Sequence, residues 1–228
     1  MTTKTASSLA EREVEIPAGQ RRLRGILSIP AEATGIVIFA HGSGSGRLSP
    51  RNQYVARSLQ RAGLATLLLD LLEDEESADR RKVFDVELLA SRLESAAFWV
   101  KQESHAGFLK LGYFGASTGA AAALIAAARR PDEAAAVVCR GGRPDLAAEY
   151  LPLVQAPALL IVGGDDDLVL DLNQQALSLL RCRKELVVVP GATHLFEEPG
   201  TLEQVAREAG RWFQKHLTPA VAARVARA

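Results

Sequence analysis

The sequence is poor in cysteine and has no excess of charge of either sign. Cys139 and Cys182 are its only cysteines, and no CxxC or Cys/His cluster accompanies them. Two cysteines are too few for a disulfide framework, and the missing motifs leave no signal for a zinc site. Lys plus Arg and Asp plus Glu each number 27, so the formal net charge is zero. A chain without net charge lacks the attraction that draws basic proteins to nucleic acids or anionic membranes, and we expect neither as the main partner.

Long hydrophobic runs are also absent. The apolar run at residues 64–69 ends at Asp70, far short of the roughly 20 residues that a spanning helix needs. Residues 1–12 are polar and lack the apolar core of a signal peptide. We therefore expect a cytoplasmic protein.

Apolar runs that resemble buried strands alternate with helical patterns between residues 35 and 216. The strand candidates are residues 35–40, 64–70, 110–114, 134–139, 158–162 and 185–189, and the helix candidates are 52–61, 86–103, 117–129, 171–180 and 202–216. This alternation predicts an α/β fold with a mostly parallel sheet and helices on both faces. Residues 13–16 and 22–29 instead alternate apolar and polar around Pro17-Ala-Gly19, which predicts an antiparallel hairpin at one edge.

No internal repeat or linker divides the chain, so residues 1–228 are predicted to form a single domain, with 1–12 and 218–228 as candidate loose tails. Only about 18 residues separate the strand candidates that end at 139 and begin at 158, too few for a separate cap domain. The cleft is therefore expected to be shallow and open.

The ligand sites of parallel sheets lie at the carboxyl ends of the strands. The candidate catalytic residues of this sequence stand there, in the loops that follow the predicted strands. Residues 115–119 read Gly-Ala-Ser-Thr-Gly between an apolar strand and an Ala-rich helix. This G-x-S-x-G context predicts a sharp turn that exposes the Ser117 hydroxyl as a nucleophile. The alternative is that Ser117 only caps the helix.

A serine nucleophile needs a base, and the base needs an acid that orients it. His194 follows the last predicted strand and is the candidate base, whereas His216 lies near a helix end beside Lys215. The acid is one of Asp165, Asp166 and Asp167, and reasoning from the residues alone leaves these three open.

The Gly-rich turn after the first buried strand predicts the oxyanion hole. A tetrahedral intermediate needs two N–H donors, one from Thr118 and the other from Ser43 or Gly44. His41 either braces this turn or contacts the substrate. A dinucleotide site is the other interpretation of the turn, but Arg47 and Ser49 stand where the third glycine of G-x-G-x-x-G would be.

Four arginines follow the predicted strand ends. Arg47 and Arg51 follow the oxyanion turn, and Arg140 and Arg143 flank Gly141-Gly142. They either bind a carboxylate or phosphate of the substrate, or they form structural ion pairs with the acidic run 73–76 or lie solvated on the surface.

Several sequence blocks together resemble the dienelactone hydrolase-like group of α/β-hydrolases. They are Phe39-Ala-His-Gly-Ser-Gly-Ser45, Ser49-Pro-Arg-Asn52, Gly112-Tyr-Phe-Gly-Ala-Ser-Thr-Gly-Ala120, Arg140-Gly-Gly-Arg-Pro144, Val162-Gly-Gly-Asp-Asp166 and Pro190-Gly-Ala-Thr-His-Leu-Phe-Glu-Glu-Pro199. The resemblance covers roughly residues 23–217 and implies the α/β-hydrolase fold. Similar sequences occur alone or fused to a phosphoribosyltransferase domain.

The resemblance also bears on the site. Its acid pattern G-x-x-D-x-x-V matches Gly163, Asp166 and Val169, and so implies Asp166 as the acid. Dienelactone hydrolases proper use a cysteine nucleophile where this chain has Ser117, which favours ordinary ester hydrolysis over lactone hydrolysis.

The predicted function is hydrolysis of small esters by Ser117, His194 and Asp166 through an acyl-enzyme, with no metal or organic cofactor. The alternatives are acyl transfer or lactone hydrolysis on the same residues, or a non-catalytic binding protein on a hydrolase scaffold. The expected partner is a small-molecule ester, and a homodimer is a further expectation.

Overall fold

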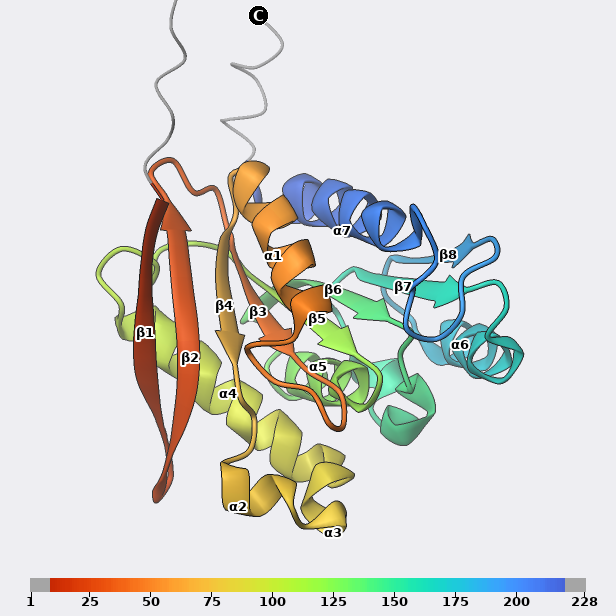
Figure 1. The fold of residues 1–228 in the computed structure, drawn as a ribbon, viewed down its shortest axis with the longest axis horizontal. Helices are drawn as coiled ribbons and strands as arrows, with labels where there is room; N and C mark the ends of the chain where they lie inside the picture. The colour runs from red at the N-terminus through yellow and green to blue at the C-terminus, as the bar shows by residue number, and fades with distance from the viewer. Residues whose placement is uncertain (1–8, 220–228) are drawn as a thin grey trace, which may run out of the picture.

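The computed structural model describes residues 9–219, which form an eight-stranded sheet between two layers of helices (Figure 1). β3, β4, β5 and β7 are buried at every residue, as expected for strands covered on both faces. The strands are β1 (Leu9–Ala18), β2 (Arg21–Pro30), β3 (Ile36–Ala40), β4 (Ala65–Leu69), β5 (Leu111–Ala116), β6 (Ala134–Arg140), β7 (Ala158–Gly163) and β8 (Lys184–Val189).

The sheet order is β1-β2-β4-β3-β5-β6-β7-β8. β2 pairs antiparallel with both β1 and β4, and the strands from β4 through β8 in this order are parallel. The predicted fold class, a mostly parallel sheet with an antiparallel N-terminal edge, is confirmed. β1 begins at Leu9, so residues 9–12, a predicted loose tail, are part of the sheet. The predicted tail at 218–228 and residues 1–8 lie almost entirely outside the described residues.

α1 and α7 cover one face of the sheet, and α4, α5 and α6 cover the other (Figure 1). α1 and α7 share a core with Phe39 and Phe114, and α4 and α5 share the second core with β1. The helices are α1 (Pro50–Arg61), α2 (Asp74–Ser77), α3 (Arg80–Val83), α4 (Val86–Gln102), α5 (Thr118–Arg129), α6 (Asp167–Leu179) and α7 (Thr201–Leu217). No helix among residues 9–219 is long and apolar enough to cross a membrane.

α5 packs closely against β5 because its side chains are small. Its first ten residues, 118–127, are all buried, and six of the ten are alanine. Small side chains let the helix axis approach the sheet closely. The start of α5 is therefore held rigidly at the end of β5, where Ser117 lies.

One helix begins earlier than the sequence indicates. The predicted start was residue 171, but α6 begins at Asp167. Asp167 and Leu168 are exposed, so the first turn of the helix shows no apolar periodicity.

The connection from β6 to β7 holds two short 3-10 turns, Pro144–Ala147 and Leu151–Leu153, and no cap domain. The connection from β4 to α4 carries α2 and α3 instead, which project below the sheet in Figure 1.

Candidate active site

Ser117 occupies a strained turn between β5 and α5. Its φ is 51° and its ψ is −122°, a region that residues other than glycine rarely adopt. A Cβ on Gly115 would lie 2.5 Å from the Cα of Ala120, and one on Gly119 would overlap the carbonyl oxygen of Ala40. Both glycines are therefore required for β5 and α5 to pass each other around the serine, which is the reason for the G-x-S-x-G spacing.

His194 is held by Asp166. The Nδ1 atom of His194 lies 2.7 Å from Oδ2 of Asp166. Because an ionised carboxylate only accepts hydrogen bonds, the proton of a neutral imidazole stands on Nδ1 and leaves the Nε2 lone pair free to act as a base. Asp165 and Asp167 are exposed to solvent, and His194 pairs with neither.

Backbone hydrogen bonds join the two loops that carry this pair. The Gly164 N–H donates to the Val189 carbonyl at 2.8 Å, and the Asp165 N–H donates to the Ala192 carbonyl at 3.0 Å. A Cβ on Gly163 would overlap the Ala192 carbonyl oxygen. The glycine pair after β7 therefore lets the loop after β8 come close enough for His194 to reach Asp166.

The turn of residues 140–143 lies between Ser117 and His194. The Ser117 N–H donates to the Arg140 carbonyl at 3.3 Å, and the Arg143 N–H donates to the Ser117 carbonyl at 3.1 Å. Gly141 has a φ of +50°, and a Cβ there would lie 3.1 Å from the His194 carbonyl oxygen. This turn fixes where the serine and the histidine lie relative to each other.

The sequence analysis missed one residue that holds this turn. Asn173 of α6 is fully buried, and its amide donates to the carbonyls of Gly142 at 2.9 Å and Val169 at 2.7 Å. Its signal in the sequence is a polar residue on the buried side of a helix.

Ser43, Gly44 and Thr118 line one cavity of about 310 Å³. Thr118 is the first residue of α5, so its N–H has no carbonyl partner within the helix. Residues 42–45 form a turn closed by the Ser45 N–H and the Gly42 carbonyl at 3.3 Å, with Gly44 at a φ of +68°. The predicted oxyanion donors therefore border the same space.

His41 has both ring nitrogens engaged within the protein. Nδ1 donates to the Gly42 carbonyl at 2.9 Å, and Nε2 accepts from the Leu71 N–H at 2.9 Å. This pattern braces the oxyanion turn against the end of β4 and requires the neutral ring. Burial lowers the pKa of His41 below its usual value, and the neutral form is favoured accordingly.

The neutral state of His41 predicts acid sensitivity. Unfolding exposes the ring, so the unfolded chain binds the extra proton, and stability falls as the pH drops below the ordinary value of 6.5. We expect urea denaturation between pH 5 and 7 to show that the free energy of unfolding falls less steeply with decreasing pH in His41→Gln than in the wild type. The wild-type slope can exceed the variant's by at most about 1.4 kcal/mol per pH unit. His105→Gln, at an exposed position, is the control, and equal slopes for wild type and His41→Gln would contradict the assignment.

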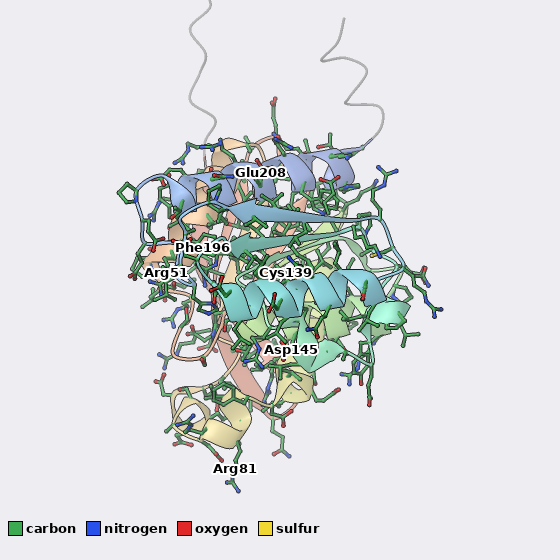
Figure 2. All side chains as sticks on the ribbon, turned by 90° about the vertical axis from the view of Figure 1, so that its right-hand side faces the viewer. Arg51, Arg81, Cys139, Asp145, Phe196 and Glu208 are labelled. Atoms are coloured by element: carbon green, nitrogen blue, oxygen red, sulfur yellow. The ribbon has the colours of Figure 1, made fainter. Side chains whose placement is uncertain are left out.

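Three of the four predicted arginines have acidic partners. Arg47 pairs with Asp70, and Arg143 makes two hydrogen bonds to Asp145 at 2.8 and 2.7 Å. Arg51, which Figure 2 labels, pairs with exposed Glu197. The two side chains are 3.1 Å apart. Arg140 has no ion-pair partner among residues 9–219.

The acidic run 73–76 pairs elsewhere. Glu73 accepts from Arg21 at 2.7 Å. Glu76, which is 4% exposed, lies 3.3 Å from Arg92 and 3.2 Å from Lys82. The predicted pairing of the four arginines with this run is therefore wrong, because the run faces α4 and β2 rather than the oxyanion turn.

The α2–α3 segment roofs the cavity beside the oxyanion turn. Leu72, Ser77, Val83 and Leu89 line the cavity opposite Ser43 and Thr118. The pairing of Glu76 with Arg92 ties the roof to α4. The segment that follows β4 therefore contributes to this cavity, and the connection from β6 to β7 does not.

The cysteines are not placed to act as nucleophiles in this site. Cys139 is fully buried in the core on the α5 side, and burial raises its pKa to about 12. Within the part of the chain that the structure describes, no three His, Cys, Asp or Glu side chains converge as a metal ion requires.

The family model described as the dienelactone hydrolase family matches residues 23–218. The chain belongs to this family. It is 55% identical to a dienelactone hydrolase from Anabaena variabilis of known crystal structure, with a TM-score of 0.89 over 92% of this chain and 99% of that one. A cold-adapted esterase from an Arctic intertidal metagenomic library shares the fold at 17% identity, with a TM-score of 0.76 over 96% of this chain and 100% of that one.

A curated relative from Mycobacterium tuberculosis carries a provisional phosphoribosyl transferase name. It is 56% identical over 209 residues, which are 92% of this chain and 47% of the relative. This chain thus spans about half the length of that relative.

Proposed function

We propose that the protein hydrolyses small carboxylic esters through Ser117, His194 and Asp166. The observation that carries the proposal is Ser117 on a strained strand-to-helix turn, with the Asp166–His194 pair across the 140–143 turn. A serine used only as a helix cap would need no positive φ, and the Ser117 side chain makes no capping hydrogen bond.

The geometry supports acyl transfer in two steps. Ser117 Oγ attacks the ester carbonyl while His194 Nε2 takes its proton, and the same nitrogen then protonates the departing alcohol. Asp166 stabilises the imidazolium that forms between these events. The Thr118 and Ser43 N–H groups donate hydrogen bonds to the carbonyl oxygen, which becomes negatively charged. Water activated by His194 then releases the acid from the acyl-enzyme.

Membership of the dienelactone hydrolase family and the named hydrolases of the same fold support this reaction class. The buried thiol of Cys139 supports serine rather than cysteine as the nucleophile.

The roofed cavity suits a small acyl group. It borders the proposed oxyanion donors and presents Leu72, Val83 and Leu89 to the acyl chain. Each methylene that is buried there gains about 0.8 kcal/mol, or roughly fourfold in kcat/KM. Methylenes that extend past the roof gain little and lose conformational freedom.

A nitrophenyl ester series from acetate to dodecanoate tests this proposal. We expect kcat/KM to rise over the first few methylenes and then to level off or fall. Val83→Trp should fill the cavity and lower the preference for butyrate over acetate by roughly tenfold. Leu153→Trp, at an exposed position outside the cavity, is the matched control. Absence of turnover with every ester would refute the function, and a steady rise to the longest soluble ester would refute the small cavity.

A further inference from the structure

Arg140 is a buried cation that has no ion-pair partner among residues 9–219. The residue is 8% exposed, and its Nε and Nη1 atoms are sealed from solvent without a hydrogen-bond acceptor. Proteins ordinarily pair buried charges, because removing a guanidinium from water is costly. Burial together with the charge of Arg51 lowers the pKa of Arg140 to about 10, so the group is still charged at neutral pH.

The position of Arg140 places this cation beside the proposed catalytic groups. Its own carbonyl accepts the Ser117 N–H, and Gly141, the next residue, packs against His194 and the Phe196 ring. Side chains alternate along a strand, and Cys139 points into the core on the α5 side. Arg140 therefore points to the opposite side, toward α1 and α7, where Val138 and Phe196 lie.

Arg51 reaches the same region from the start of α1. It bridges to Glu197, which directly follows Phe196 on the loop after β8, and the labels of Arg51 and Phe196 lie close together in the view of Figure 2. Its Nε atom is also buried without an acceptor. Glu197 is 65% exposed, so this partner lies at the surface and is readily displaced.

We propose that Arg140 and Arg51 bind a phosphate group on the alcohol side of the ester substrate. This inference rests on the proposed function, because the site can bind part of an ester substrate only if the protein hydrolyses esters. The acyl cavity is lined by Leu72 and Leu89 of the core on the α5 side, whereas Arg140 faces the other side of the sheet. A substrate whose acyl group fills the cavity therefore directs its alcohol part toward the two arginines.

Phosphate suits this pair better than a carboxylate does. The two guanidinium groups have three nitrogens that lack an acceptor and are closed to solvent. A phosphate reaches them where the release of Arg51 from Glu197 opens the space beside the arginines, and its three oxygens then accept their hydrogen bonds. Its charge of nearly −2 matches two arginines once Glu197 is displaced. A carboxylate has two oxygens for these three nitrogens, and its single charge balances both arginines only while Glu197 keeps its bridge to Arg51.

Binding is tested without turnover in Ser117→Ala. We expect inorganic phosphate to bind in calorimetry at constant ionic strength and acetate to bind far more weakly. Adding Arg140→Met should weaken phosphate binding on the order of 10- to 100-fold, the size of a lost charged hydrogen bond. Arg57→Met, an exposed arginine of α1, should change nothing. Arg51→Met provides a second variant at a partly exposed position, with a smaller loss expected.

Substrate preference is tested with three acetyl esters that share one acyl group: monoacetylglycerol, its phosphate derivative and the matching glycerate. The wild type should prefer the phosphate ester by tenfold or more in kcat/KM, mainly through KM, and Arg140→Met should bring this ratio toward one.

Absence of phosphate binding, or equal binding in wild type and both arginine variants, would overturn the site. Equal preference for the glycerate would overturn the phosphate assignment. Phosphate binding without hydrolysis of any ester would refute the proposed function but leave the site intact.

Discussion

Ser117→Ala is expected to lower kcat toward nitrophenyl acetate by a factor on the order of 10⁴ or more, because the members of a serine triad act as a unit. In the proposed mechanism this hydroxyl forms the bond to the acyl group, and Cys139 cannot replace it because its thiol is fully buried. A fluorophosphonate probe should label the wild type on one serine and leave the variant unlabelled.

The interpretation of this variant depends on an intact turn. Alanine keeps the Cβ of serine, so the backbone at a φ of 51° carries the same strain in both proteins. The thermal midpoint should therefore change little. A folded Ser117→Ala protein with near-normal turnover would remove Ser117 from the mechanism, and a wild type that resists the probe would favour a binding protein on this scaffold.

Asp166→Asn should reduce kcat about as severely, by a factor on the order of 10⁴. An asparagine amide can donate to Nδ1 of His194, which would place the ring proton on Nε2 and remove the lone pair that accepts the serine proton. Steady-state kinetics with nitrophenyl acetate measures the effect.

The neighbouring acids are matched controls for this prediction. Asp165→Asn and Asp167→Asn remove the same charge from adjacent, exposed positions that His194 does not contact. Both should retain most of the activity. If either of them is the crippled variant, Asp166 does not orient His194 during the reaction.

The strands and the nucleophile turn could be predicted from the sequence because their causes are local. Fully buried strands such as β3 and β7 are continuous apolar runs, and the sequence boundaries differ from the observed ones by only a few residues. The turn at Ser117 depends on glycines two positions away on each side, and on the Ala-rich helix that follows. Local sequence contains all of this information.

Contacts between distant segments decided the rest. Asp165, Asp166 and Asp167 are the same residue type in succession, so their composition cannot distinguish them, and only the family resemblance pointed to Asp166. The structure joins Asp166 to His194 because β7 and β8 are adjacent and hydrogen bonds tie their loops together.

The sequence likewise could not predict the partners of the arginines or the position of the α2–α3 segment over the cavity. All four arginines follow strand ends, but whether a cation finds an acid depends on how the loops fold back. Arg47 meets Asp70 after β4, whereas Arg140 meets none among the described residues. The acidic run that contains Glu76 has the composition of a solvated surface, yet Arg92 of α4 draws Glu76 into a buried pair. The sequence by itself determined the strands, the candidate nucleophile and its candidate base, since these follow from short-range patterns. Only the tertiary structure decided which charges are neutralised and which residues line the cavity at the oxyanion turn, because charge pairing and enclosure depend on segments far apart in the chain.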